Sequence, residues 1–142
     1  MPTIRQYKDS TDRIQVVELW QKVFGYETAH NEPNLAISKK LATNDGLFFV
    51  AVENTEVVGT IMAGYDGHRG WLYSVAVDPK IRLNGLGSSL VQHAEKALAD
   101  LGCMKVNLQL LDTNEATAAF YKSIGYSVEP RLSMGKLITR SV

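Results

Sequence analysis

Residues 71 to 88 constrain the fold more than any other part of the chain. Leu72, Ser74 and Ala76 are expected to point to one face of a strand and the residues between them to the other, which is the period of two that a β-strand shows. Pro79 then ends the strand, because proline has no N–H group to donate to a β-ladder. The segment therefore opens with one strand of a sheet.

A loop with two glycines, Gly85 and Gly87, follows this strand and leads into a helix. The helix is predicted because apolar residues recur at helical spacing, namely Leu86, Leu90, Ala94, Ala97, Leu98 and Leu101. The first turn of a helix carries free N–H groups and the positive end of the helix dipole. Glycines let a ligand approach the backbone, since no Cβ blocks it. Strand, loop and helix together form a candidate phosphate-binding site.

The rest of the chain alternates between predicted strands and helices. The other predicted elements are a strand over 3–7, helices over 14–24 and 35–42, a hairpin over 47–63, a strand over 106–111, a helix after Asn114 and a last strand over 132–138. A strand–helix–strand crossover over 71–111 implies one parallel pair. The predicted fold class is α/β (α+β), with a mixed, mostly antiparallel sheet of about six to seven strands and helices on both faces.

Length and composition favour one globular domain over residues 1–142. The chain is 45% hydrophobic, which supplies a full core, and it balances 15 basic against 15 acidic residues. Because no block of like charge stands out, neither nucleic acid nor an anionic membrane is expected as the main partner.

The cysteine, the histidines and the N-terminus carry further predictions. Cys103 is the single cysteine, so no intrachain disulfide is expected, which is compatible with a reducing compartment. His30, His68 and His93 are scattered without metal spacing, so no metal site is predicted. Residues 1–10 do not read as a signal peptide, and no apolar run reaches the length of a membrane span. The expected location is cytoplasmic.

Two motifs recur together in one enzyme family. The first is Arg82 followed by Gly85 and Gly87, after a Val-x-Val-Asp-Pro run at residues 75–79. The second begins at Asn114 and continues with Ala-Ala-Phe-Tyr and Ile-Gly-Tyr as far as residue 126. With them the chain resembles the GCN5-related N-acetyltransferase (GNAT) family, and the order of elements agrees over roughly residues 3 to 138.

Details of the resemblance set it apart from other glycine-loop folds. The run over 64–70 is similar to a subgroup of small, poorly characterised bacterial members, whereas Leu83 stands where the family often has glycine. A glycine pair before a helix often makes only a tight turn, but the combination of both motifs is far more specific. A Rossmann site is disfavoured because Leu90 occupies the third glycine position, and a P-loop because no Gly-Lys-Ser/Thr is present.

The resemblance implies transfer of an acetyl group from acetyl-CoA to an amine. Backbone groups of the glycine loop would hold the pyrophosphate of CoA, and the strand before it would pair with pantetheine and polarise the thioester carbonyl. The residues implied for acetyl-CoA binding are Val75, Ala76, Val77, Arg82, Leu83, Asn84, Gly85, Leu86, Gly87, Ser88, Asn114 and Tyr121.

The resemblance also assigns the departing thiolate a proton donor, Tyr121. Asn114 lies seven residues earlier, on nearly the same helix face, and is expected to cap the helix. The alternative is that Tyr121 simply packs beside Phe120 in the core.

The general base is less defined by the sequence. Some family members use a glutamate where this chain has Gln109, which cannot accept a proton. Asp66 and His68 are the catalytic candidates, although Asp66-Gly67 is also a turn signal. Tyr73, Glu27, His30 and water relays stay open as alternatives.

The acceptor is expected to be a small amine, an amino acid or a peptide N-terminus. The walls of the acceptor site are predicted at residues 25–34, 64–70 and 129–133, which supply acidic and aromatic side chains. One alternative is a non-catalytic acyl-CoA-binding or sensing domain, favoured by the missing carboxylate and by Leu83. Another is a plain interaction protein without a cofactor. Edge strands can pair between chains, so the sequence also permits a homodimer.

Overall fold

The structure, a computed structural model, describes residues 2–82 and 84–138. These residues fall into two compact units that divide after Leu108, and each unit is described by itself. The prediction of a single domain over residues 1–142 stays a prediction.

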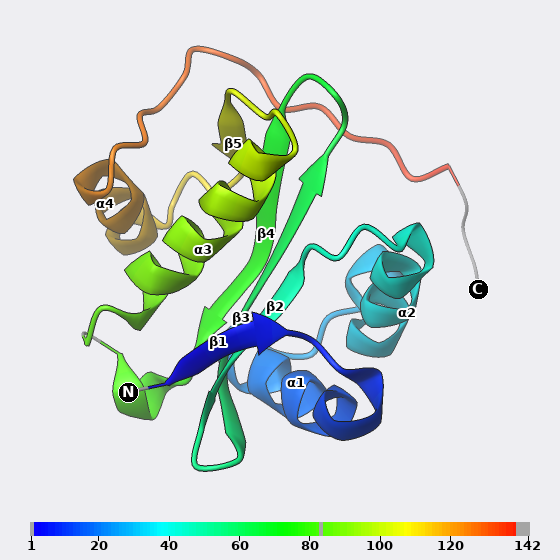
Figure 1. Cartoon of the computed structure of the whole chain (residues 1–142). Helices are drawn as coiled ribbons and strands as arrows, with labels where there is room; N and C mark the ends of the chain where they lie inside the picture. Colours follow the sequence, from blue (N-terminus) through cyan, green and yellow to red (C-terminus); the bar gives the residue numbers. More distant parts are fainter. Residues whose placement is uncertain (1, 83, 139–142) are drawn as a thin grey trace. The chain divides into compact units, whose positions relative to one another are not determined.

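The first unit is built on a five-stranded sheet with the strands in chain order (Figure 1). The strands are β1 (Thr3–Gln6), β2 (Phe48–Glu53), β3 (Glu56–Tyr65), β4 (Gly70–Val77) and β5 (Val106–Leu108). All neighbours are antiparallel except β4 and β5, which are parallel as the crossover predicted. The predicted count of six to seven strands was too high.

Helices cover both faces of this sheet, as predicted. Figure 1 shows α1 (Asp9–Phe24) and α2 (Pro33–Thr43) on one face and α3 (Leu86–Asp100) on the other. Short 3₁₀ turns at Ala29–Asn31 and Pro79–Ile81 precede α2 and α3. On the first face the buried core includes Val16, Trp20, Ile37, Phe48, Val50 and Met62. Burial of these apolar side chains is the main force that holds the helices on the sheet.

The second unit contains one helix, α4 (Glu115–Ser123). The side chain of Asn114 caps it by accepting a hydrogen bond from the N–H of Thr117 at 3.3 Å, as expected. The predicted strand over 132–138 is absent among the described residues of this unit. Leu132 and Met134 are each 92% exposed, so the alternation of apolar residues there buries nothing against a neighbouring strand.

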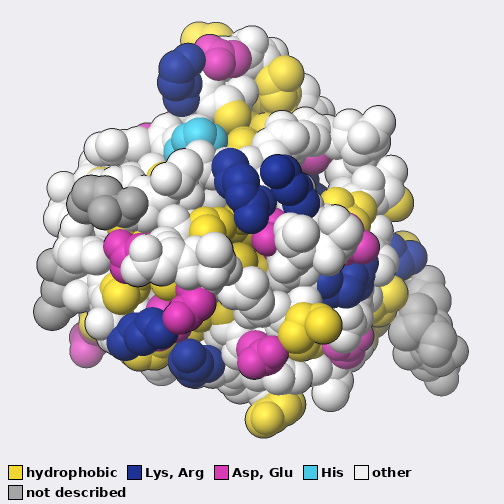
Figure 2. Space-filling view, turned by 60° about the horizontal axis from the view of Figure 1, so that its bottom comes forward, with side chains coloured by type: hydrophobic (Ala, Val, Ile, Leu, Met, Phe, Trp, Pro, Cys, Tyr) yellow, Lys and Arg dark blue, Asp and Glu magenta, His cyan; other side chains and the backbone are white. Residues whose placement is uncertain are grey.

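Charges of both signs are mixed on the surface. Figure 2 shows acidic and basic side chains interspersed on one face, without a patch of a single sign. Among the described residues, no helix is both long and apolar enough to cross a bilayer.

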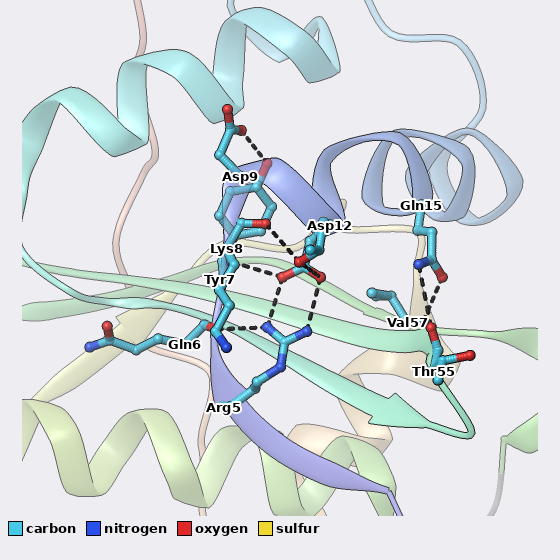
Figure 3. Close-up of polar contacts among 10 residues, drawn as sticks. Arg5, Gln6, Tyr7, Lys8, Asp9, Asp12, Gln15, Thr55 and Val57 are labelled. Carbon is cyan, nitrogen blue, oxygen red and sulfur yellow. Dashed lines mark hydrogen bonds and ion pairs between the residues drawn. The ribbon is translucent and has the colours of Figure 1, made fainter.

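A buried carboxylate ties the start of α1 to β1 (Figure 3). Asp12, 1% exposed, accepts hydrogen bonds from both terminal nitrogens of Arg5 at 2.8 and 3.0 Å and from the N–H of Lys8 at 2.8 Å. Burial by itself would raise the pKa of Asp12, but these donors outweigh it and the pKa is lowered. Asp12 is therefore held ionised in the fold.

Candidate functional site

The centre of β4 contains a β-bulge that the sequence did not reveal. Thr60 pairs with Ala76 and Met62 pairs with Tyr73, so one residue of β3 lies opposite two residues of β4. Ser74 has a φ of 51°, a left-handed conformation that costs a non-glycine residue about 1–3 kcal/mol. The predicted strict alternation is wrong here, and bulges of this kind are common next to functional sites.

The bulge decides which main-chain groups face the outer edge of β4. At the start of the strand, the N–H of Gly70 donates to the carbonyl of Lys105 beside β5, at 2.8 Å. Just past its end, the N–H of Asp78 donates instead to Val58 on β3, also at 2.8 Å. Along a regular strand, the N–H and C=O groups of successive residues point alternately to the two neighbouring strands. The N–H groups of Gly70 and Asp78, which are an even number of residues apart, should therefore point to the same neighbouring strand. They point to opposite neighbours because the bulge shifts the alternation by one residue. Counted back from Asp78, the main-chain groups of Val77 and Val75 therefore face the β5 side.

That edge is open beyond the first residues of β4. The pairing of β4 with β5 runs from Gly70 to Leu72, and within residues 2–82 and 84–108 no strand pairs with β4 on that side further along. Val75 and Val77 thus lie at an edge without a partner strand among these residues, and the carbonyl of Val77 there accepts a hydrogen bond from the side chain of Arg82. This matches the requirement for an extended ligand that adds to a sheet by hydrogen bonds.

The glycine loop meets α3 as the sequence predicted. Gly85 is the residue before the helix, with a φ of 85°, and a Cβ built on it would meet nothing within 4 Å. The side chain of Asn84 accepts the N–H of Leu86 at 3.2 Å, and the first N–H bonded inside the helix is that of Ser89. Within the described residues, the N–H groups of Gly87 and Ser88 have no acceptor in the first turn of the helix, which makes them candidates for binding a ligand.

Two further predicted residues in this loop have different outcomes. The side chain of Arg82 turns back to β4, where its Nε donates to the carbonyl of Val77 at 3.2 Å. Arg82 is exposed, so it can also reach an anion near the loop. Leu83 lies outside the described residues.

A cleft of about 270 Å³ opens against the bulge from the side of α1 and α2. It is lined by Trp20, Phe24, Gly25, Glu27, Asn31, Pro33, Ala36, Tyr73 and Ser74. Glu27 is the single charged side chain among these lining residues. The predicted acceptor wall over 25–34 thus contributes to a cleft, whereas residues of the 64–70 turn do not line it.

Asp66 and His68 occupy the turn between β3 and β4, away from this cleft. Asp66 accepts the N–H groups of His68 and Arg69 at 2.8 and 2.7 Å and the indole N–H of Trp71 at 3.3 Å. The hydrogen bonds from Arg69 and His68 lower the pKa of Asp66, which makes it a weaker base. The turn precedes Gly70, and Ser74 in the cleft lies four residues beyond Gly70, about 13 Å along the strand. Asp66 and His68 are therefore distant from the cleft.

The residues predicted near the thiolate belong to the second unit. Tyr121 is 6% exposed, and its ring contacts the rings of Phe120 and Tyr126 at centroid distances of 4.9 and 5.6 Å. Burial raises its pKa to about 12, so the hydroxyl stays protonated at neutral pH. Gln109, at the position of the family's glutamate, donates from its side-chain amide to the hydroxyl of Ser133 at 2.6 Å.

The residues that sequence reasoning missed are those that define the bulge. Ser74 carries no local signal for a left-handed conformation, whereas Asn31 lies within the predicted acceptor wall over 25–34. Trp20 belongs both to the core and to the cleft, since it is 4% exposed and lines the cleft.

The comparisons with known proteins agree with this geometry. The model of the acetyltransferase (GNAT) family matches residues 13–126. The structure is similar to that of Ard1 from Thermoplasma volcanium, with a TM-score of 0.78, 25% identity and coverage of 90% of this chain and 84% of that one. It is also similar to the ribosomal-protein-S18-alanine N-acetyltransferase from Escherichia coli, with a TM-score of 0.70, 25% identity and coverage of 88% and 77%.

A third solved structure contains coenzyme A. The PaiA N-acetyltransferase from Thermoplasma acidophilum, in complex with coenzyme A, has a TM-score of 0.72 at 19% identity, with coverage of 92% of each chain. At that identity it supports the fold alone. The family match covers most of the chain and includes both motifs, and the chain therefore belongs to the acetyltransferase (GNAT) family.

Proposed function

We propose that this protein transfers an acetyl group from acetyl-CoA to the primary amine of a small molecule, an amino acid or a peptide N-terminus. The observation that carries the proposal is the bulged β4, whose pairing with β5 ends at Leu72 and which has a cleft against Ser74. One strand thereby offers a place for an extended donor and a place for a second molecule.

The glycine loop fits the pyrophosphate of acetyl-CoA. The space in front of Gly85 is open, and the N–H groups of Gly87 and Ser88 lie at the positive end of α3. Arg82 can add a positive charge. From there the pantetheine arm would extend along Val75 and Val77, where main-chain groups can supply hydrogen bonds in place of a neighbour strand once Arg82 releases the carbonyl of Val77.

The cleft fits an amine with an apolar body. Trp20, Phe24 and Tyr73 supply aromatic surface, and the carboxylate of Glu27 attracts an ammonium group. Polyanionic acceptors are disfavoured by the same carboxylate. We assign Glu27 the first place among the candidate bases because it lines the cleft, with Asp66, His68 and water relays as the alternatives to be tested.

In the proposed reaction, the neutral amine nitrogen attacks the thioester carbon and the carbon–sulfur bond breaks. The N–H of Val75 stabilises the negative charge that forms on the carbonyl oxygen. The amine gives up its proton to Glu27 or to water, and the thiolate receives one from the hydroxyl of Tyr121. The role of Tyr121 is based on the family resemblance together with its protonated state.

The test is acetyl-CoA-dependent release of free thiol over a panel of amines, amino acids and peptides, preceded by a thermal shift. A ligand that binds only the folded state at a hundred times its Kd stabilises it by about 2.7 kcal/mol. We expect both a shift and turnover with at least one amine. A shift without turnover on any acceptor class would support an acyl-CoA-binding domain instead, and the lack of both would contradict the proposal.

A further inference from the structure

We propose that Thr60, oriented by Trp20, is a positioning residue that holds the Ser74–Val75 peptide of the bulge in its reversed orientation. This inference rests on the proposed function, because it assigns the N–H of Val75 as the donor to the thioester oxygen. Thr60 and Trp20 lie on β3 and α1, and neither belongs to the motifs that identify the family.

A chain of two hydrogen bonds links the three residues. The indole Nε1 of Trp20 donates to Oγ1 of Thr60 at 2.8 Å, and Oγ1 of Thr60 lies 2.9 Å from the carbonyl oxygen of Ser74. An indole N–H can only donate and a carbonyl can only accept, so the direction of both bonds is fixed. The hydroxyl of Thr60 must therefore give its proton to Ser74.

The first bond of the chain, between Trp20 and Thr60, is buried, which makes it costly to lose. Thr60 is fully buried, at 0% exposure, and Trp20 is 4% exposed. An orphaned indole N–H would carry its desolvation cost there, whereas the carbonyl of Ser74 belongs to a half-buried residue beside the cleft. The chain thereby offsets part of the cost of the left-handed conformation of Ser74.

Fixing the carbonyl of Ser74 also fixes the N–H of Val75. The two groups belong to one planar trans peptide and point in opposite directions. Because the carbonyl is bound on the β3 side by Thr60, the N–H must point away from β3, toward the open edge. The alternation counted back from Asp78 gives the same direction independently.

The position of Trp20 connects this chain to the acceptor cleft. One side of its indole lines the cleft, while its N–H begins the chain that ends at the bulge. The residue that contacts the acceptor is thus also the one that orients the hydroxyl of Thr60. A loss of the indole N–H should therefore affect turnover even when the aromatic surface is kept.

The test compares Thr60→Val, which removes the hydroxyl at nearly constant shape, with Thr60→Ser, which keeps it. Ile37→Val, a buried change on α2, controls for lost stability. Three quantities are measured: kcat, the KM for acetyl-CoA, and the amide resonance of Val75 in the ligand-free protein. We expect Thr60→Val to lower kcat about tenfold or more at a KM within about twofold of wild type, and to shift the Val75 resonance. Thr60→Ser should restore both.

The contrary outcome is a Thr60→Val protein whose kcat matches that of Ile37→Val, or whose Val75 resonance does not move. If Thr60→Val fails to fold, Trp20→Phe removes the indole N–H together with part of the aromatic surface of the cleft. It is therefore compared with wild type in kcat at saturating amine and in the Val75 resonance. If the wild-type protein shows no turnover, the proposed function fails, while the ligand-free resonance still decides whether Thr60 fixes the peptide.

Discussion

Leu90 packs on Gly59 so closely that a Cβ added to Gly59 would lie 3.0 Å from Cδ1 of Leu90. The same Cβ would lie 3.3 Å from the carbonyl oxygen of Ala76 and from Cδ2 of Leu86. The absence of a side chain on β3 thus lets the first turns of α3 lie against the sheet. This contact positions the N-terminal end of α3, where we propose that the pyrophosphate binds.

Gly59→Ala is therefore expected to destabilise the fold by about 1–3 kcal/mol, the usual range for overpacking a core. Urea unfolding measures the change. Gly135→Ala is the matched control, because a Cβ on Gly135 meets nothing within 4 Å, and it should change stability by less than about 0.5 kcal/mol. Equal stabilities of the two variants would contradict the packing described here.

Replacing the buried carboxylate with Asp12→Asn should cost about 2 kcal/mol at neutral pH, because the donors of Arg5 and Lys8 lose a charged acceptor. The pKa of Asp12 is lowered in the fold, so its contribution is present above its unfolded pKa, near 3.8, and is lost as the pH falls through the folded value. The gap between wild type and variant should accordingly narrow on acidification.

Unfolding by urea at several pH values from 7 downward checks this. Asp100→Asn, which removes a partner of the exposed Lys96, should cost less than about 0.5 kcal/mol throughout. If the difference in free energy of unfolding between wild type and Asp12→Asn grew toward acid pH, the prediction would be wrong.

Glu27→Gln should raise the KM for the amine about fivefold and leave the KM for acetyl-CoA unchanged, because an exposed charge pair contributes up to about 1 kcal/mol. The effect should shrink as salt is added. Glu18→Gln makes the same charge change at an exposed position of α1 outside the cleft lining, and it should behave as wild type. If Glu27 is also the base, kcat falls as well and the acid limb of the pH profile disappears.

The alternative bases are separated by Asp66→Asn and His68→Ala. Because Asp66 is occupied by the N–H groups of the turn, we expect both variants to keep kcat within about twofold of wild type at every pH. A tenfold fall, with a changed pH profile, would move the base to this turn.

Tyr121→Phe should lower kcat at least tenfold and leave the binding of acetyl-CoA nearly intact, because only the proton for the departing thiolate is lost. The pKa of Tyr121, raised to about 12, means that the wild-type kcat should not decline through ionisation of this residue below about pH 11. Tyr65→Phe, which removes an exposed hydroxyl bound to Gly67, is the control. Unchanged turnover would exclude Tyr121 from the mechanism.

Local signals predicted most of the elements of this fold. Asn54 and Thr55, both with positive φ, make the expected hairpin turn between β2 and β3. Pro79 follows the end of β4 because proline restricts the backbone wherever it occurs, and Gly85 precedes α3 because glycine frees it. These are properties of single residues, so they can be seen in the sequence.

The bulge could not be predicted in this way. Ser74 adopts its left-handed conformation because Thr60, 14 residues earlier, binds its carbonyl, and Thr60 is in turn held by Trp20. Such an arrangement depends on contacts between three separate elements. The same holds for the cleft, whose residues come from α1, α2 and β4 and from the segment that joins the two helices.

The most direct test of the account is titration calorimetry of acetyl-CoA into wild type, Ser88→Asp and Gln92→Glu. An added carboxylate in the first turn of α3 favours the helix itself yet repels a pyrophosphate, whereas Gln92 is an exposed residue one turn further on. We expect wild type and Gln92→Glu to bind one acetyl-CoA per chain with similar Kd, and Ser88→Asp to bind at least tenfold more weakly. Equal binding by all three proteins, or none by wild type, would contradict the placement of the cofactor at this helix.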